Sequence, residues 1–105
     1  MATTFEVLAE PTRRHILDLL LEQPRAVGDL VDAVGLSQPG TSKHLRVLRD
    51  AGLVDVRKDA QRRVYSVRTE PLAELDAWLE PYRRLWAGRL DALERHLDVD
   101  QGESR

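Results

Sequence analysis

The residues of this chain that are best suited to chemistry lie in the stretch from Ser37 to Gly52. At about 100° per residue, the spacing of a helix, amide, hydroxyl and charged groups fall on one side of this stretch. These residues are Gln38, Pro39, Ser42, Lys43, Arg46 and Asp50. Amides and hydroxyls can hydrogen-bond to base edges, and cations can bind phosphates. The pattern predicts a surface that contacts nucleic acid, although an ordinary solvated helix face has similar polarity.

The same stretch carries the signals of a helix with two marked ends. The Ser37 hydroxyl is suited to cap the first turn, and Pro39 fits a position where no amide hydrogen bond is lost. Gly52 stands where a left-handed residue ends a helix. The side opposite the polar groups consists of Thr41, Leu45 and Leu48. We therefore predict a helix that packs one face on a domain and presents the other to a partner.

Basic residues are concentrated in this helix and in the segment that follows it. The chain has 105 residues and a net charge of −2, yet residues 37–68 hold eight basic and three acidic residues. The segments before and after are acidic in balance. A basic region on an acidic protein is typical of salt-sensitive binding to a polyanion.

Length and composition limit the alternatives. A chain of 105 residues with 42% hydrophobic residues can fold as one small domain. It has no cysteine, which excludes disulfides and thiolate metal sites. No apolar run is long enough to span a membrane, and residues 1–10 lack the pattern of a secretion signal. We expect a cytoplasmic protein without a membrane segment.

The elements before the polar helix complete a known arrangement. Pro11 begins a predicted helix that ends at about Glu22, with an apolar stripe formed by Ile16, Leu17, Leu20 and Leu21. A shorter helix is predicted over Val27–Val34, and Gly35, Leu36 and Ser37 then form a tight turn. Two helices joined by a glycine turn, the second with a polar outer face, predict a helix-turn-helix at about residues 27–52.

A β-hairpin is predicted at about residues 53–68, directly after the polar helix. Leu53–Arg57 and Val64–Val67 are rich in β-branched residues, and the polar segment between them is expected to form the turn. A hairpin in this place is a wing, whose Lys58, Arg62 and Arg63 could reach the DNA backbone or minor groove. A solvated hairpin tip is the alternative.

A long helix is predicted at about residues 71–97. Its apolar residues recur at steps of three and four, as in a coiled-coil seam, and are Leu72, Leu75, Leu79, Tyr82, Trp86, Leu90 and Leu93, followed by Leu97. Pro81 is expected to kink this helix or to split it. Because so long a seam would be an apolar patch if exposed, we predict a twofold homodimer interface. The alternative is a helix that folds back onto its own domain.

The predicted fold is therefore mostly α with a small β-hairpin: one winged helix-turn-helix domain over residues 1–105, dimerised through its terminal helices. The segments AEPTRRHILDLL, VGDL, LSQPGTSKHLRVLRDAGLV and RRVYSV occur in this order. From about Leu8 to Val67 the chain thus resembles the ArsR-type family of bacterial winged-helix transcriptional regulators. The resemblance implies a homodimeric repressor that occupies an operator, often its own promoter. The DNA contacts of that family map onto Ser37, Gln38, Pro39, Ser42 and Lys43, with wing arginines added.

The chain departs from the metal-sensing members of that family. Their cysteine-bearing box corresponds to residues 26–30 here, where cysteine is absent. On the last helix, His96 has only Asp91, Asp98 and Asp100 nearby, whereas zinc sites need three or four ligands in a set geometry. We predict no metal and no cofactor. The residues leave open whether a small-molecule effector regulates the protein.

These observations predict a sequence-specific DNA-binding transcriptional regulator, a homodimeric repressor of a palindromic operator. The predicted DNA-binding residues are Ser37, Gln38, Pro39, Ser42, Lys43, Arg46, Arg62 and Arg63. The alternative is a winged-helix protein-interaction module without sequence-specific DNA binding. An enzyme is not predicted, because no nucleophile–base pair, phosphate loop or clustered acid–base set is recognisable.

Overall fold

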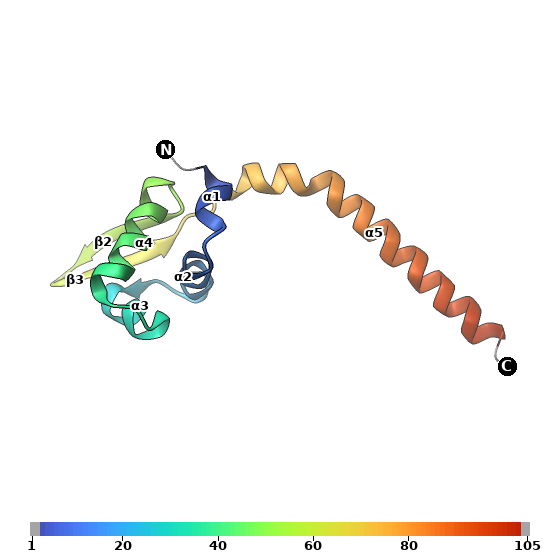
Figure 1. Cartoon of the computed structure of the whole chain (residues 1–105), viewed down its shortest axis with the longest axis horizontal. Helices are drawn as coiled ribbons and strands as arrows, with labels where there is room; N and C mark the ends of the chain where they lie inside the picture. Colours follow the sequence, from blue (N-terminus) through green and yellow to red (C-terminus); the bar gives the residue numbers. More distant parts are fainter. Residues whose placement is uncertain (1–2, 104–105) are drawn as a thin grey trace. The chain divides into compact units, whose positions relative to one another are not determined.

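The computed structural model describes residues 3–103, and the side chains through Leu97. The chain divides into two compact units after Leu75. In chain order the elements are α1 (Thr4–Leu8), α2 (Pro11–Glu22), β1 (Arg25–Ala26), α3 (Val27–Val34), α4 (Gln38–Asp50), β2 (Val54–Asp59), β3 (Arg62–Val67) and α5 (Leu72–Glu103) (Figure 1).

The predicted ends of the helices are confirmed by their hydrogen bonds. At the start of α4 the amide of Gly40 donates to the hydroxyl oxygen of Ser37 at 3.1 Å. At its end the Leu53 amide donates to the Leu48 carbonyl and the Gly52 amide to the Arg49 carbonyl, both at 2.9 Å. This is the Schellman arrangement, which requires the left-handed backbone that Gly52 adopts at φ +76°. Thus α4 begins and ends where the sequence predicts.

The helix-turn-helix consists of α3, a three-residue turn and α4, as predicted. Gly35 ends α3 in the left-handed conformation at φ +72°, and its amide donates to the Val31 carbonyl at 3.1 Å. The chain can therefore reverse direction and start α4 at once. Both helices contribute to one core, which consists of Val7, Ile16, Leu20, Leu30, Leu45, Leu48, Leu53 and Val54. Leu21 was expected on the buried stripe of α2, but its side chain is 72% exposed and this prediction is wrong.

The wing, which is the β2–β3 hairpin, is longer than predicted and belongs to a three-stranded antiparallel sheet of order β1-β3-β2. Strand pairing continues to Asp59 and Arg62, so the connection has two residues instead of the polar segment of six. Ala60 adopts φ +56°, which closes this short turn, and the oppositely charged Asp59 and Arg62 face each other beside it. Polar residues are tolerated on these strands because the outer part of the hairpin is exposed.

Strand β1 was not predicted. It has two residues, Arg25 and Ala26, which pair with Tyr65 and Val64 of β3. A strand of two residues is too short to show the alternation of apolar and polar side chains that identifies a strand in a sequence. It forms only because β3 lies beside it.

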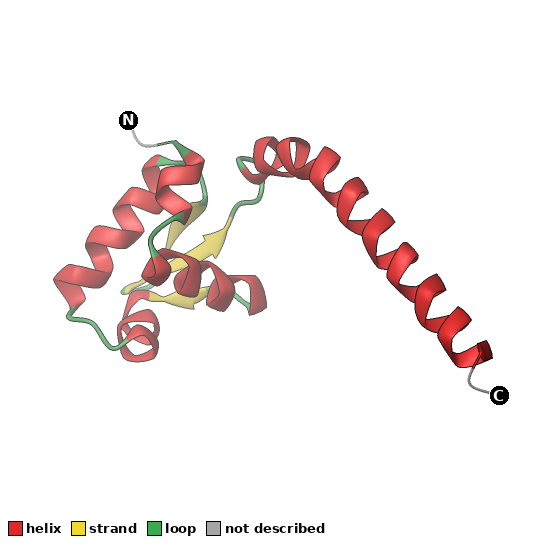
Figure 2. Cartoon of the chain, turned by 45° about the vertical axis from the view of Figure 1, so that its right-hand side comes forward, coloured by secondary structure: helices red, strands yellow, loops and turns green. Residues whose placement is uncertain are grey.

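The last helix, α5, is continuous from Leu72 to Glu103 (Figure 2). The predicted end at about residue 97 is too early, and a split at Pro81 does not occur. A proline inside a helix removes one amide donor. The neighbouring leucine, alanine, glutamate and arginine residues are strong helix formers and maintain the helix across that position.

Candidate nucleic-acid interface

The two sides of α4 differ completely in burial. Thr41, Leu45 and Leu48 are fully buried. On the other side Ser42 is half-buried, while the exposed residues are Ser37, Gln38, Pro39, Lys43 and Arg46. Because the buried side fixes the helix on the core, the polar groups form a preorganised surface. The structure therefore brings the predicted α4 residues together on one accessible face.

The first turn of α4 has a fixed hydrogen-bond pattern. The Ser37 hydroxyl oxygen accepts from the Gly40 amide, which leaves the hydroxyl hydrogen able to donate to an outside acceptor. The Ser37 carbonyl accepts from the Thr41 amide at 2.9 Å and from the Thr41 hydroxyl at 3.0 Å. The hydroxyl of the buried Thr41 is therefore satisfied locally, and the turn that carries Gln38 and Pro39 is held in place.

A polar junction connects α4 with α2. The Arg13 Nε donates to the His44 Nδ1 at 3.3 Å, and the Glu10 Oε2 lies 3.7 Å from that nitrogen. Glu10 also accepts from the Arg13 amide at 3.0 Å and so caps α2. The junction thus links the start of α2 with the middle of α4 through partly buried polar side chains.

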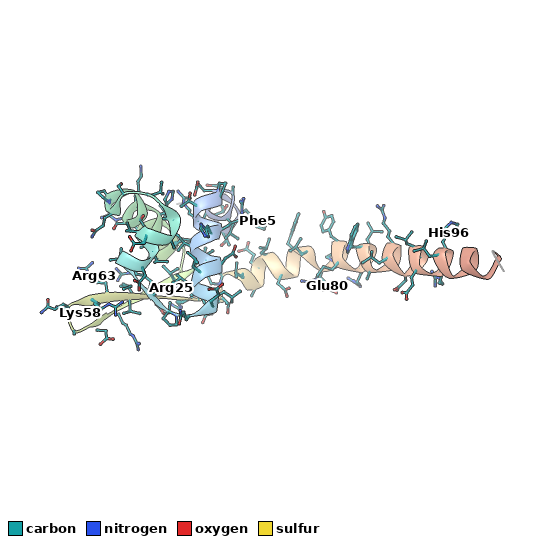
Figure 3. The ribbon with its side chains drawn as sticks, turned by 90° about the horizontal axis from the view of Figure 1, so that it is seen from below. Phe5, Arg25, Lys58, Arg63, Glu80 and His96 are labelled. Atoms are coloured by element: carbon teal, nitrogen blue, oxygen red, sulfur yellow. The ribbon has the colours of Figure 1, made fainter. Side chains whose placement is uncertain are left out.

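The wing arginines have different environments. Arg62 forms an ion pair with Asp29 of α3 at 3.3 Å, with both side chains more than half exposed. Ion pairs this exposed contribute little to stability. Arg63 instead borders a hollow that it shares with Arg46 of α4. Figure 3 shows Lys58 and Arg63 on the outer part of the hairpin.

In the second unit, large apolar side chains project from α5 into solvent. Those about half exposed or more are Trp78, Tyr82, Leu85, Trp86, Leu90, Leu93 and Leu97. Leu79 of this unit is half-buried. Leu72 and Leu75, on the part of α5 that belongs to the first unit, are half-buried as well, and Leu72 packs against the core of that unit. Trp78 and Leu85 are exposed apolar residues outside the predicted interface, because the predicted seam passes through their neighbours Leu79 and Trp86. The steps of four and three from Trp78 through Tyr82 to Leu85 were the signal that they lie on the same side of the helix.

The acidic and basic side chains of α5 pair with one another along the helix. Arg83 donates to Asp76 and to Glu80, and these hydrogen bonds, that with Asp76 first, raise the pKa of the Arg83 guanidinium. Arg84 also lies 3.6 Å from Glu80. These ion pairs make one side of the helix polar. On its apolar side the Trp78 and Tyr82 rings contact each other at a centroid distance of 4.9 Å, and Trp86 is 62% exposed.

Two other kinds of site are absent from the described part of the chain. No three histidine, aspartate or glutamate side chains there gather closely enough to hold a metal ion. No helix there is both long and apolar enough to cross a membrane.

Comparison with known proteins gives matches over the region of the helix-turn-helix. The family model described as bacterial regulatory protein, arsR family, matches residues 10–56. The HTH-type transcriptional regulator Rv0081 of Mycobacterium tuberculosis is 44% identical over 75 residues, which are 70% of this chain and 66% of that protein. The match therefore spans slightly less than two thirds of the length of Rv0081. The crystal structure of Rv0081 gives a TM-score of 0.62 at 36% identity, over 82% of this chain and 88% of that one.

Two further relatives extend the match. The transcriptional repressor SdpR of Bacillus subtilis is 33% identical over 79 residues, which are 75% of this chain and 88% of that protein. The homodimeric winged helix-turn-helix DNA-binding domain Mb0332 of Mycobacterium bovis, solved in solution, gives a TM-score of 0.60 at 33% identity. That superposition covers 74% of this chain and 72% of the other.

Proposed function

Because this chain belongs to the arsR family of bacterial regulatory proteins, we propose that it is a homodimeric repressor that binds a palindromic DNA operator through α4. The observation that carries the proposal is the two-sided α4, buried along Thr41, Leu45 and Leu48 and polar on its accessible face. Names of relatives support the repressor role and the homodimer. The activity is binding rather than catalysis, and it takes place in the cytoplasm, where bacterial DNA lies.

Within this proposal the α4 residues divide into two roles. Gln38 and Ser42 address base edges, since an amide can bind adenine in two places and a hydroxyl can bind several bases. Lys43 contacts a guanine or a phosphate. The residues that hold the DNA backbone are Ser37, Arg46, Arg62 and Arg63. Base contacts set the sequence, and backbone contacts set the register and most of the salt dependence.

The exposed apolar side chains of α5 support the homodimer. Tyr82, Trp86, Leu90 and Leu93 are each about half exposed or more on the single chain. A continuous apolar surface of this kind marks an interaction site in a soluble protein. A twofold pairing of these helices buries the same side chains from both copies. It also presents two α4 helices to half-sites about one DNA turn apart.

A pair of lysine variants tests the role of α4. The chain has two lysines, Lys43 on α4 and Lys58 on the wing. Binding is measured by gel shift to the DNA upstream of the gene and to the same DNA with its sequence scrambled. We expect Lys43→Ala to weaken upstream binding by about 1–3 kcal/mol, the value of one good base contact. The matched Lys58→Ala removes a wing cation outside the proposed set of backbone contacts. Any loss of binding that it causes should be equal for the two duplexes, because a contact with the DNA backbone carries no sequence information.

Two results of these binding measurements would contradict the proposal. If wild-type protein does not distinguish the upstream DNA from the scrambled duplex, the chain is an interaction module rather than a sequence-specific repressor. If wild type does distinguish them but Lys43→Ala binds both as wild type does, then α4 is not the surface that reads the sequence.

A further inference from the structure

A polar hollow of about 330 Å³ separates the second half of α4 from the wing. Arg49 lies on α4 one turn beyond Arg46, and Arg63 faces them from β3. The other polar side chains at its wall are Ser42, Asp50 and Tyr65. The first turn of α4 that carries Gln38 is at the opposite end of the helix from Arg49, so the hollow extends the predicted DNA face toward the wing.

The charges of this hollow are unbalanced. In the part of the chain that the structure describes, Arg46, Arg49 and Arg63 form no ion pair and no side-chain hydrogen bond. Arg46 and Arg49 are three residues apart on one helix, a spacing at which like charges repel. Asp50 is the one carboxylate at the wall. Three guanidinium groups around one hollow thus leave a net positive site that an anion would stabilise.

The position of the hollow indicates which anion it receives. When a recognition helix occupies the major groove and a wing reaches the neighbouring minor groove, the sugar–phosphate strand between the two grooves must pass between helix and wing. In this chain the space between α4 and β3 is this arginine-lined hollow. A phosphodiester offers two acceptor oxygens to guanidinium groups, which bind phosphate in two places at once.

We propose that the hollow binds one phosphodiester of the DNA backbone and that Arg49 is a phosphate-binding residue beside Arg46 and Arg63. Arg49 lies outside the residues that the sequence predicts for DNA contact. The inference rests on the proposed function, since it takes α4 and the wing as the two sides of the DNA interface. A purely structural role for Arg49, as a cation near the end of a helix, is the competing explanation.

The salt dependence of binding separates these explanations. We would measure fluorescence anisotropy of a duplex of about 30 base pairs, three helical turns of arbitrary sequence, over a range of sodium chloride concentrations. The slope of log K against log salt is negative, and its magnitude decreases by about 0.9 for each phosphate contact that is lost. Arg49→Gln should therefore lower the magnitude of the slope by about 0.9 per protomer, or about 1.8 for a dimer, and weaken binding roughly ten-fold. Arg49→Lys should retain the slope because it keeps the charge.

Two further variants make the test specific to the hollow. Arg57→Gln removes the same charge from β2, outside the hollow, and should change the slope by less than half as much. Asp50→Asn removes the carboxylate at the wall and should tighten binding about five-fold per protomer, the effect of one charge pair about 4 Å apart in water. A gain in affinity cannot result from partial unfolding. Thermal melts of all variants establish that they are folded.

The inference is overturned if Arg49→Gln keeps the wild-type slope, or if Arg57→Gln lowers the slope as much as Arg49→Gln does. Failure of the proposed function has a different signature. In that case wild-type protein gives the same affinity for the upstream DNA and for the arbitrary duplex, whatever the behaviour of the Arg49 variants.

Discussion

Alanine substitutions at three glycines test the backbone of the helix-turn-helix, because they should change the free energy of unfolding in opposite directions. Gly35 ends α3 at φ +72° and Gly52 follows α4 at φ +76°. Gly28 lies inside α3, and its φ is not positive. A Cβ added at Gly28 or Gly35 meets nothing within 4 Å, and one at Gly52 lies 3.4 Å from the Pro71 Cγ, an ordinary contact. Steric clashes are therefore not what distinguishes the three positions.

The backbone conformation at each glycine determines how much the free energy of unfolding changes. An L-residue held in the left-handed region costs about 1–2 kcal/mol. Against this, alanine gains about 0.4–1 kcal/mol because it restricts the unfolded chain more than glycine does. Gly35→Ala and Gly52→Ala should each lower the free energy of unfolding by about 1 kcal/mol. Gly28→Ala should raise it by about 0.5 kcal/mol, since alanine is the better helix former.

The assay is thermal unfolding followed by circular dichroism, at one fixed protein concentration because a dimer's stability depends on concentration. For a chain of this size, 1 kcal/mol shifts Tm by about 4–8 °C. Gly35→Asn is the matched control, because asparagine tolerates the left-handed region and should lose less stability than alanine. If Gly35→Ala melts at the wild-type temperature, the turn between α3 and α4 does not have a left-handed residue there and the reasoning fails.

Two other predictions concern the cap of α4 and the face of α5. Ser37→Ala removes the acceptor for the Gly40 amide and should destabilise the protein by about 1 kcal/mol in the same melt. Ser37→Asp should retain the cap, because a carboxylate can accept the same hydrogen bond. Equal melting temperatures of the two variants would contradict the role of Ser37 as the cap of α4. Trp86→Glu places a charge among the exposed apolar side chains of α5 and should weaken dimerisation by at least about 2 kcal/mol, measured by sedimentation equilibrium. Arg89→Glu changes a residue that is also exposed and should not weaken dimerisation. Unchanged dimerisation of Trp86→Glu would refute the proposed interface.

Local signals were sufficient to predict the helices of the winged unit. Ser37, Gly35 and Gly52 mark helix ends through hydrogen bonds that involve residues three to five positions away. The helix ends can therefore be predicted from the spacing of residues alone. The two faces of α4 follow from the same periodicity. The bounds of α2 and α3 were predicted for the same reason, because Pro11 and Gly35 mark ends that no distant part of the chain needs to supply.

The features that were missed depend on contacts between distant segments. Arg25 and Ala26 are a strand only because Tyr65 and Val64 lie beside them. The wing strands extend through polar residues because Asp59 and Arg62 face each other across the turn, which no apolar alternation reveals. The hollow that Arg49 lines likewise depends on Arg63, which another element brings to the same place. Spacing along the sequence contains no information on such pairs.

The central claim is that two copies of the chain present Gln38, Ser42 and Lys43 in matched pairs to one duplex. Selection of bound sequences from a random DNA pool tests it most directly. We predict enrichment of an inverted repeat whose half-site centres are about 10 base pairs, one helical turn, apart. Enrichment of a single unpaired half-site, or of no sequence at all, would contradict the claim.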